Sequence, residues 1–178
     1  MIAFNPIDWL LLFALVTAVC TDLYRGKIYN LLVYPSMVIA LVALTIKGGL
    51  GGLAAGVVGL AAGLLLLMIP FVLGGMGAGD VKLLALVGAF KGPYFVFNAF
   101  LASAIAGGAI ALVLLLQRKE LGLFFKKILF VLKSMLYRIP SGKVFTTLDE
   151  ARPGESFPYA LAIFIGVLAV YLAGEGIV

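Results

Sequence analysis

The sequence predicts an all-α polytopic membrane protein with about six transmembrane helices. Its composition, its apolar runs and its basic residues all favour that class. Of the 178 residues, 64% are hydrophobic and 12% are charged, and the mean hydropathy is +1.22. Soluble domains are about half apolar and about a quarter charged. We therefore expect residues 1–178 to form a single membrane-embedded domain.

The apolar runs supply the predicted helices. A helix needs about 20 apolar residues to cross roughly 30 Å of hydrocarbon. One run is too short for a full crossing unless the turns on either side of it are buried in protein, and we expect it to be a short fourth helix. The first run lacks a basic leader and contains Asp8, so we expect it to remain as a helix rather than act as a signal peptide. The runs cover residues 7–21, 31–46, 53–73, 81–90, 94–116 and 159–173.

The basic residues predict the orientation, because cytoplasmic loops of membrane proteins are enriched in Lys and Arg. With both termini outside, only Lys47 and Lys91 of the 13 basic residues fall outside the cell. The other eleven lie between apolar spans, which favours anionic lipids of the inner leaflet as a partner and argues against nucleic acid. We expect a multi-pass protein of the cytoplasmic (inner) membrane, N-out and C-out. The inside residues are Arg25, Lys27, Lys82, Arg118, Lys119, Lys126, Lys127, Lys133, Arg138, Lys143 and Arg152.

Residues 117–158 form the one long polar connection, which this orientation places in the cytoplasm. At 100° per residue, its first half gathers lysines on one side and apolar residues such as Phe124 and Ile128 on the other. This pattern is typical of a basic amphipathic helix lying on an anionic membrane surface. It would either tether the loop or dock a substrate.

The residues that are missing limit the chemistry. The chain has no histidine and a single cysteine, Cys20. Serine–histidine and cysteine–histidine nucleophile pairs, histidine-bearing zinc sites and cysteine zinc clusters are therefore excluded. We expect no metal and no cofactor, and any acid–base chemistry must come from eight acidic residues.

Two of these acids, Asp22 and Asp80, are the candidate catalytic residues. Each lies at the inner end of a predicted helix, and they are 58 positions apart. That separation equals about two crossings of ~20 residues plus turns, so the chain leaves and returns to the same side. An acid at a membrane span is expensive and is a functional candidate by default. A lone aspartate could instead be a helix-end residue facing water or an N-cap.

Asp80 follows a glycine-rich turn, GGMGAGD (74–80). Glycines there permit positive φ and close backbone approach, so Gly77 and Gly79 are predicted to support the turn that presents Asp80. Lys82 is two residues further on and points elsewhere on the helix, where it stays at the interface or orients a substrate. Two carboxyl groups in a confined site keep one proton between them. Such a pair can activate water and polarise a peptide carbonyl, which is aspartic peptidase chemistry.

Three segments resemble one known family, the type IV prepilin peptidases, which are membrane aspartic proteases of the Gly-x-Gly-Asp class. TDLYRGKIYN (21–30) is similar to the family's Asp…Arg-x-Ile-Pro-Asn segment, with Tyr29 where proline is usual. GAGDVKLLA (77–85) is similar to its signature, and FPYALAIFIG (157–166) to the Pro-Tyr opening of its last helix. The short forms tied to tight-adherence pili and the archaeal preflagellin peptidases are the most similar branches.

The resemblance implies a function and roles for individual residues. It implies removal of the leader peptide of prepilin-like proteins at the cytoplasmic face, with Asp22 and Asp80 as the catalytic dyad. Matching motif positions with a substrate-binding or structural role are Arg25, Asn30, Pro158 and Tyr159. Larger members add a four-cysteine metal cluster and N-methylate the product; this chain has no such cysteines, which argues against methyltransferase activity.

Three other functions fit parts of the pattern. Glycine-interrupted helices with intramembrane acids also describe ion-coupled transporters, although those bind at the midplane. A presenilin-like intramembrane protease shares the acid chemistry but cuts within transmembrane helices. A non-catalytic assembly subunit would tolerate loss of either aspartate. Glycine-rich faces at 48–63 and 102–111 can pack within one chain or between chains, so the oligomeric state stays open.

Overall fold

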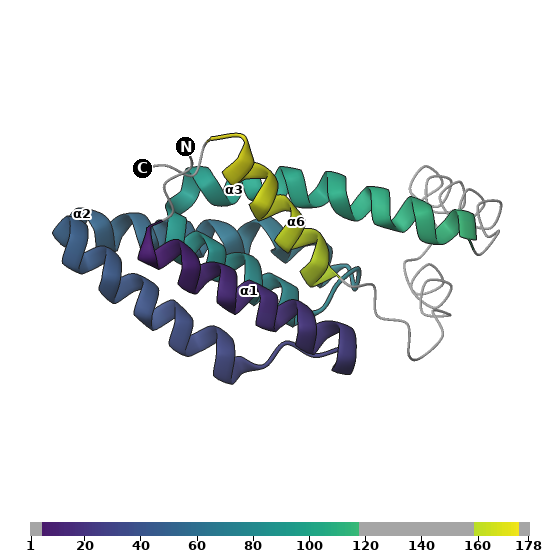
Figure 1. Ribbon diagram of the computed structural model, residues 1–178, viewed down its shortest axis with the longest axis horizontal. Helices are drawn as coiled ribbons and strands as arrows, with labels where there is room; N and C mark the ends of the chain where they lie inside the picture. Colours follow the sequence, from purple (N-terminus) through teal and green to yellow (C-terminus); the bar gives the residue numbers. More distant parts are fainter. Residues whose placement is uncertain (1–4, 118–158, 175–178) are drawn as a thin grey trace, which may run out of the picture. The chain divides into compact units, whose positions relative to one another are not determined.

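A computed structural model describes residues 5–117 and 159–174, and these residues form four helices (Figure 1). Three of them are long and apolar enough to cross a membrane, and the last is a shorter apolar helix. The predicted all-α membrane class is therefore confirmed. The amphipathic helix expected in the 117–158 loop, and Pro158, lie outside the described residues. The helices are α1 (Pro6–Arg25), α2 (Asn30–Val72), α3 (Ala78–Gln117) and α6 (Tyr159–Leu172).

The local sequence explains both ends of α1. Asn5 is the N-cap and Pro6 occupies the first helical position, where a missing N–H is harmless. The Asn5 N–H donates to Asp8 Oδ2 at 2.9 Å, as in a capping box. At the other end Gly26 takes a left-handed conformation with φ 61°, and its N–H donates to the Asp22 carbonyl oxygen at 2.7 Å. Asp22 is thereby held in the last turn.

A single glycine bends α2 back on itself. Gly49 has φ 59° and ψ −142°, which are not helical angles. A Cβ on Gly56 would meet the side chains of Leu41 and Leu44, so the stretches before and after Gly49 run antiparallel in contact. Figure 1 shows this hairpin. The reversal lies between the two runs for which the sequence predicts separate helices, 31–46 and 53–73.

A second glycine interrupts α3. Gly92 has φ 80° and ψ 179°, and Pro93 follows it. This break lies between the predicted helices 81–90 and 94–116. The sequence therefore predicts the positions of both breaks, but the number of separate helices, six, is not confirmed, because each break uses one positive-φ glycine rather than a loop. The six crossings and the N-out orientation stay predictions.

The core is built around the run that is too short to cross a membrane alone. Every residue from Val81 to Phe90 is buried except Lys82, which is partly buried. The second stretch of α2 lies directly against this run: a Cβ on Gly88 would overlap the Gly59 carbonyl, and one on Gly63 would meet Leu84 and Ala85 backbone atoms. α1 packs against both α2 and α6. The short run is therefore enclosed by protein, whereas the turn before it is mostly exposed, at Gly74, Gly75, Gly77 and Ala78.

Candidate active site

The segments that resemble the prepilin peptidase motifs come together at one end of this bundle. Asp22 lies in the last turn of α1, and its carboxylate accepts a hydrogen bond from the backbone N–H of Ala160. Ala160 is the second residue of α6. The first N–H groups of a helix lack intrahelical partners and attract negative charge. Asp22 thus joins the end of α1 to the start of α6.

Asp80 is the third residue of α3 and is buried, with 8% of its surface exposed. Its Oδ2 accepts the Gly77 N–H at 3.2 Å, so it serves the helix terminus from the third position rather than as the N-cap. Its charge interacts electrostatically with Asp22 and with Tyr159. No basic side chain among residues 5–117 and 159–174 forms an ion pair with Asp80.

The glycine-rich turn before Asp80 differs in detail from the prediction. Of its four glycines, Gly74 alone has positive φ, 75°. The Gly75 N–H then donates to the Pro70 carbonyl at 2.8 Å, which closes the turn after α2. Gly79 matters for space, because a Cβ there would press against Ile28 at 3.0 Å. Gly77 contributes its N–H to Asp80, and a Cβ there would make only ordinary contacts.

Lys82 ties the Asp80 helix to the segment that follows Asp22. Its Nζ donates to Asn30 Oδ1 at 3.0 Å and lies 5.5 Å from the ring centroid of Tyr34. Asn30 begins α2. Together with the contact of Gly79 and Ile28, this bond holds the 21–30 and 77–85 segments side by side. The predicted motif residues Asn30, Gly79, Asp80 and Lys82 therefore lie close together in the structure.

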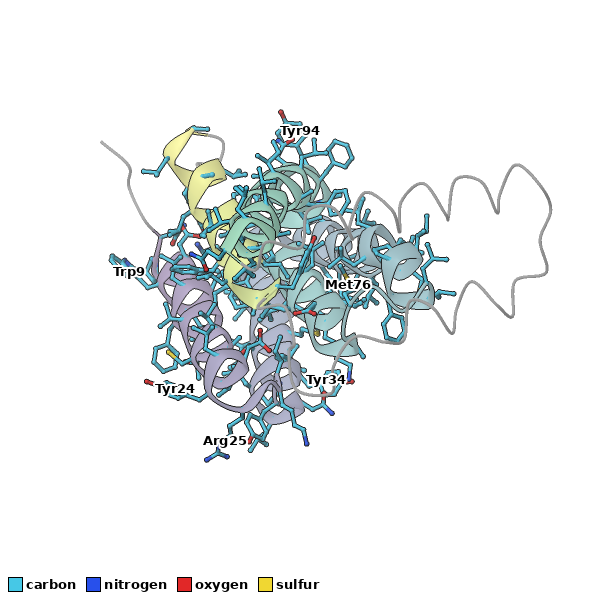
Figure 2. The ribbon with its side chains drawn as sticks, turned by 90° about the vertical axis from the view of Figure 1, so that its right-hand side faces the viewer. Trp9, Tyr24, Arg25, Tyr34, Met76 and Tyr94 are labelled. Carbon is cyan, nitrogen blue, oxygen red and sulfur yellow. The ribbon has the colours of Figure 1, made fainter. Side chains whose placement is uncertain are left out.

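Arg25 lies at the same end but on the outer surface. Its Nη1 donates to the Tyr29 hydroxyl at 2.8 Å, and its guanidinium lies 5.9 Å from that ring. Figure 2 views the molecule from this end and shows Tyr24 and Arg25 pointing away from the bundle. Tyr29 is the N-cap of α2. The Arg25–Tyr29 pair therefore belongs to the exposed rim of the site rather than to the Asp22–Asp80 dyad.

Sequence reasoning missed a polar cluster at the opposite end of the same helices. Lys91 Nζ lies 2.7 Å from Asp8 Oδ1, and the Tyr171 hydroxyl donates to the same oxygen at 3.0 Å. Asp8 is almost completely buried, with 4% exposure. A signal was present: Asp8 and Lys91 are opposite charges that the predicted orientation places on the same outer side.

The described residues offer no constellation for a metal ion. Within 5–117 and 159–174, no group of three or more His, Cys, Asp or Glu residues gathers in a way that could hold one. The chemistry that these residues can perform is acid–base chemistry by two carboxyl groups.

Comparisons with known proteins identify the family of the chain but do not test the arrangement of the site. Neither the curated proteins nor the solved structures that were compared gave a significant match. A family comparison did, over residues 9–112, which is more than half of the chain and contains both aspartates and the 21–30 and 77–85 segments. The chain therefore belongs to the type IV leader peptidase family.

Proposed function

We propose that this protein is a membrane aspartic endopeptidase that removes the leader peptide of type IV prepilin-like proteins at the cytoplasmic membrane face. Family membership supports protease activity. The observation that carries the aspartic mechanism is the electrostatic interaction of Asp22 and Asp80 at the meeting point of α1, α3 and α6. Asp22 and Asp80 are the catalytic residues of the proposal.

The chemistry needs only these two groups and water. One carboxyl group keeps a proton and hydrogen-bonds the scissile carbonyl oxygen, while the ionised partner removes a proton from the attacking water. The tetrahedral intermediate then collapses, and the proton passes to the leaving amine. Both acids accept a backbone N–H at a helix start, from Ala160 and from Gly77, and these bonds fix their orientation.

The burial of the site favours cleavage close to the membrane. Asp80 is buried within the bundle, whereas Arg25 is exposed on the rim. A substrate with an apolar helix next to its cleavage point could lie along the apolar surface of the bundle and present the bond at the level of the dyad. The basic residues of the predicted cytoplasmic side would then contact anionic lipid or the polar part of the substrate.

The alternative functions differ in where the acids lie and where the cut falls. A transporter would hold its acids near the midplane, whereas Asp22 and Asp80 lie at helix ends. A presenilin-like protease would release fragments cut inside the apolar helix. A prepilin peptidase cuts once, at the boundary between the leader and that helix.

The test is to incubate the purified protein, in membranes, with a prepilin-like substrate and to determine the N-terminus of the product by mass spectrometry. One new N-terminus at the start of the apolar segment supports the proposal. Several cuts within that segment favour the presenilin-like alternative. Intact substrate across a panel of prepilins contradicts the proposal.

We expect cleavage activity to depend on the hydrogen bond between Lys82 and Asn30, so that loss of either side chain has the same effect. A hydrogen bond to a charged group contributes about 1.5–3 kcal/mol, so Lys82→Met and Asn30→Ala should each lower kcat/KM by about tenfold or more. The double variant should be little worse than either single variant, because both remove the same bond.

Lys27→Met is the matched control for this prediction, since it removes an exposed basic residue from the loop between α1 and α2. It should leave kcat/KM within about twofold of the parent, as surface substitutions usually do. If the loss of kcat/KM in the double variant equals the product of the losses in the two single variants, the two side chains act separately.

A further inference from the structure

We infer that Asp8, Lys91 and Tyr171 form a positioning clamp that sets the geometry of the Asp22–Asp80 dyad from the opposite end of the bundle. The expected effect on catalysis rests on the proposed function. The expected effect on the arrangement of the helices rests on the structure alone. None of the three residues touches the proposed reacting atoms. Their effect would pass along the helices that carry those atoms.

The cluster is buried and has several partners for each group. The side chains of Lys91 and Asp8 are only 12% and 5% exposed. Asp8 accepts hydrogen bonds from the Asn5 N–H and the Tyr171 hydroxyl in addition to its ion pair. The Lys91 ammonium also lies 5.0 Å from the Tyr171 ring centroid and 5.7 Å from that of Phe95.

The two aromatic rings complete the enclosure of the ammonium. Phe95 and Tyr171 pack edge to face, with centroids 5.2 Å apart. Aromatic faces attract a cation, and edge-to-face contact is a favoured ring geometry. The Lys91 head group is therefore confined by a carboxylate and two rings, which fixes its place between α1, α3 and α6.

Each of the three helices carries one residue of the clamp and one residue at the dyad end. α1 carries Asp8 and Asp22, α3 carries Lys91 and Asp80, and α6 carries Tyr171 and Ala160. The separations are 14, 11 and 11 residues. At 1.5 Å per residue they correspond to about 21 Å, about 17 Å and about 17 Å along the helix axes.

These spacings also place the two ends on the same side of each helix. At about 100° per residue, 14 residues leave a rotation of about 40°, and 11 residues leave about 20°. On each helix, the residue at the clamp and the residue at the dyad end therefore face the same neighbouring helices. Fixing the rotation and axial position of the helices at one end thus fixes them at the other, because a short helix is stiff.

The break at Gly92 explains why α3 needs such an attachment. Lys91 is the last residue before the non-helical Gly92, which Pro93 follows. The helical stretch that begins near Asp80 ends at Lys91, so the cluster holds this stretch at the point where the helix is interrupted. Buried ion pairs add little net stability compared with apolar residues, but they can specify one arrangement among several.

The test separates positioning from stability through a double substitution. Asp8→Asn or Lys91→Met alone leaves an unpaired buried charge and destabilises the fold. The double variant Asp8→Asn, Lys91→Met leaves no buried charge, so its melting temperature should return toward that of the parent. The clamp is still absent in it, and kcat for leader cleavage should fall on the order of 10- to 100-fold with KM little changed.

A geometric readout makes the test independent of catalysis. Spin labels at Tyr24→Cys on α1 and Ala78→Cys on α3, both exposed positions, report the dyad end by pulsed electron paramagnetic resonance in a Cys20→Ala background. We expect one narrow distance distribution in the parent and a broadened or shifted one in the double variant. Val167→Ala, a buried truncation in the middle of α6, should lower the melting temperature but leave the distances and kcat unchanged.

The outcomes are distinct. A double variant with parental distances and parental kcat overturns the clamp. So does a Val167→Ala variant that changes both readouts as much as the double variant does, because any loss of stability would then suffice. If the parent protein cleaves no prepilin, the proposed function fails, while the distance distributions still decide whether the cluster positions the helices.

Discussion

Substituting Asp22 or Asp80 by asparagine is expected to abolish leader cleavage while leaving the protein folded. Asparagine keeps the shape and an acceptor oxygen, so the hydrogen bonds from the Ala160 and Gly77 N–H groups can persist. It cannot take up or deliver the proton that the proposed mechanism requires. Loss of a positioned acid or base lowers rates by 10²–10⁴-fold, and we expect a loss on the order of 10³-fold or more.

The double variant gives the sharper form of this prediction. Residues that act as one unit are strongly non-additive, so Asp22→Asn with Asp80→Asn should be no less active than either single variant. The measurement is the initial rate of leader release at matched protein concentration, with melting temperatures recorded for each variant. Activity within about threefold of the parent in either single variant would refute a catalytic dyad.

Asp80→Glu tests geometry rather than charge. It retains a carboxyl group but moves it outward by one methylene, away from the site that the Gly77 N–H and the third position of α3 define. A displacement of about 1 Å can cost on the order of 10²-fold in rate. We expect activity above that of Asp80→Asn and well below that of the parent.

Gly88→Ala is expected to have the largest effect on stability. A Cβ at this position would overlap the carbonyl oxygen of Gly59, which is a backbone atom and cannot move aside by a rotamer change. Overpacking a core costs about 1–3 kcal/mol where side chains can adjust, so we expect about 3 kcal/mol or more here. α2 and α3 would have to move apart at this point. This movement would also displace the stretch of α3 that begins near Asp80.

Gly108→Ala is the matched control, since it adds the same methyl group to the same helix. Nothing lies within 4 Å of its Cβ position, and the residue is exposed. Alanine is a better helix former than glycine by about 0.8–1.0 kcal/mol, so this change should be neutral or slightly stabilising. Thermal unfolding of the two variants in the same detergent checks the pair. Equal melting temperatures would show that the Gly59–Gly88 approach is not tight in solution.

The prediction of the fold succeeded where the apolar pattern is strong and was less exact where the chain turns. Residues 81–90 are too short to cross a membrane by themselves, and the structure encloses them in protein. Both predicted interruptions are present, yet Gly49 and Gly92 make them with single residues. Whether a glycine takes positive φ depends on the contacts of the helices on either side, and composition does not report those.

The turn before Asp80 shows the same limit. The sequence predicts that glycines there permit positive φ and close approach, but it does not divide these tasks among them. The structure gives positive φ to Gly74, close contact with Ile28 to Gly79 and a hydrogen bond with Asp80 to Gly77. Ile28 and Asp80 are far apart in the chain, so only packing could reveal the role of Gly79.

The sequence by itself determined the membrane class, the two candidate carboxyl groups and the family, because apolar composition and short motifs are local properties of the chain. It also indicated that Asp22 and Asp80 lie on one side, since two crossings bring the chain back. Only the tertiary structure decided that α6 donates to Asp22, that Lys82 bonds Asn30, and that Asp8, Lys91 and Tyr171 meet in a buried cluster. These contacts join residues from different helices, and their partners are set by helix rotation and packing, which no single stretch of sequence encodes.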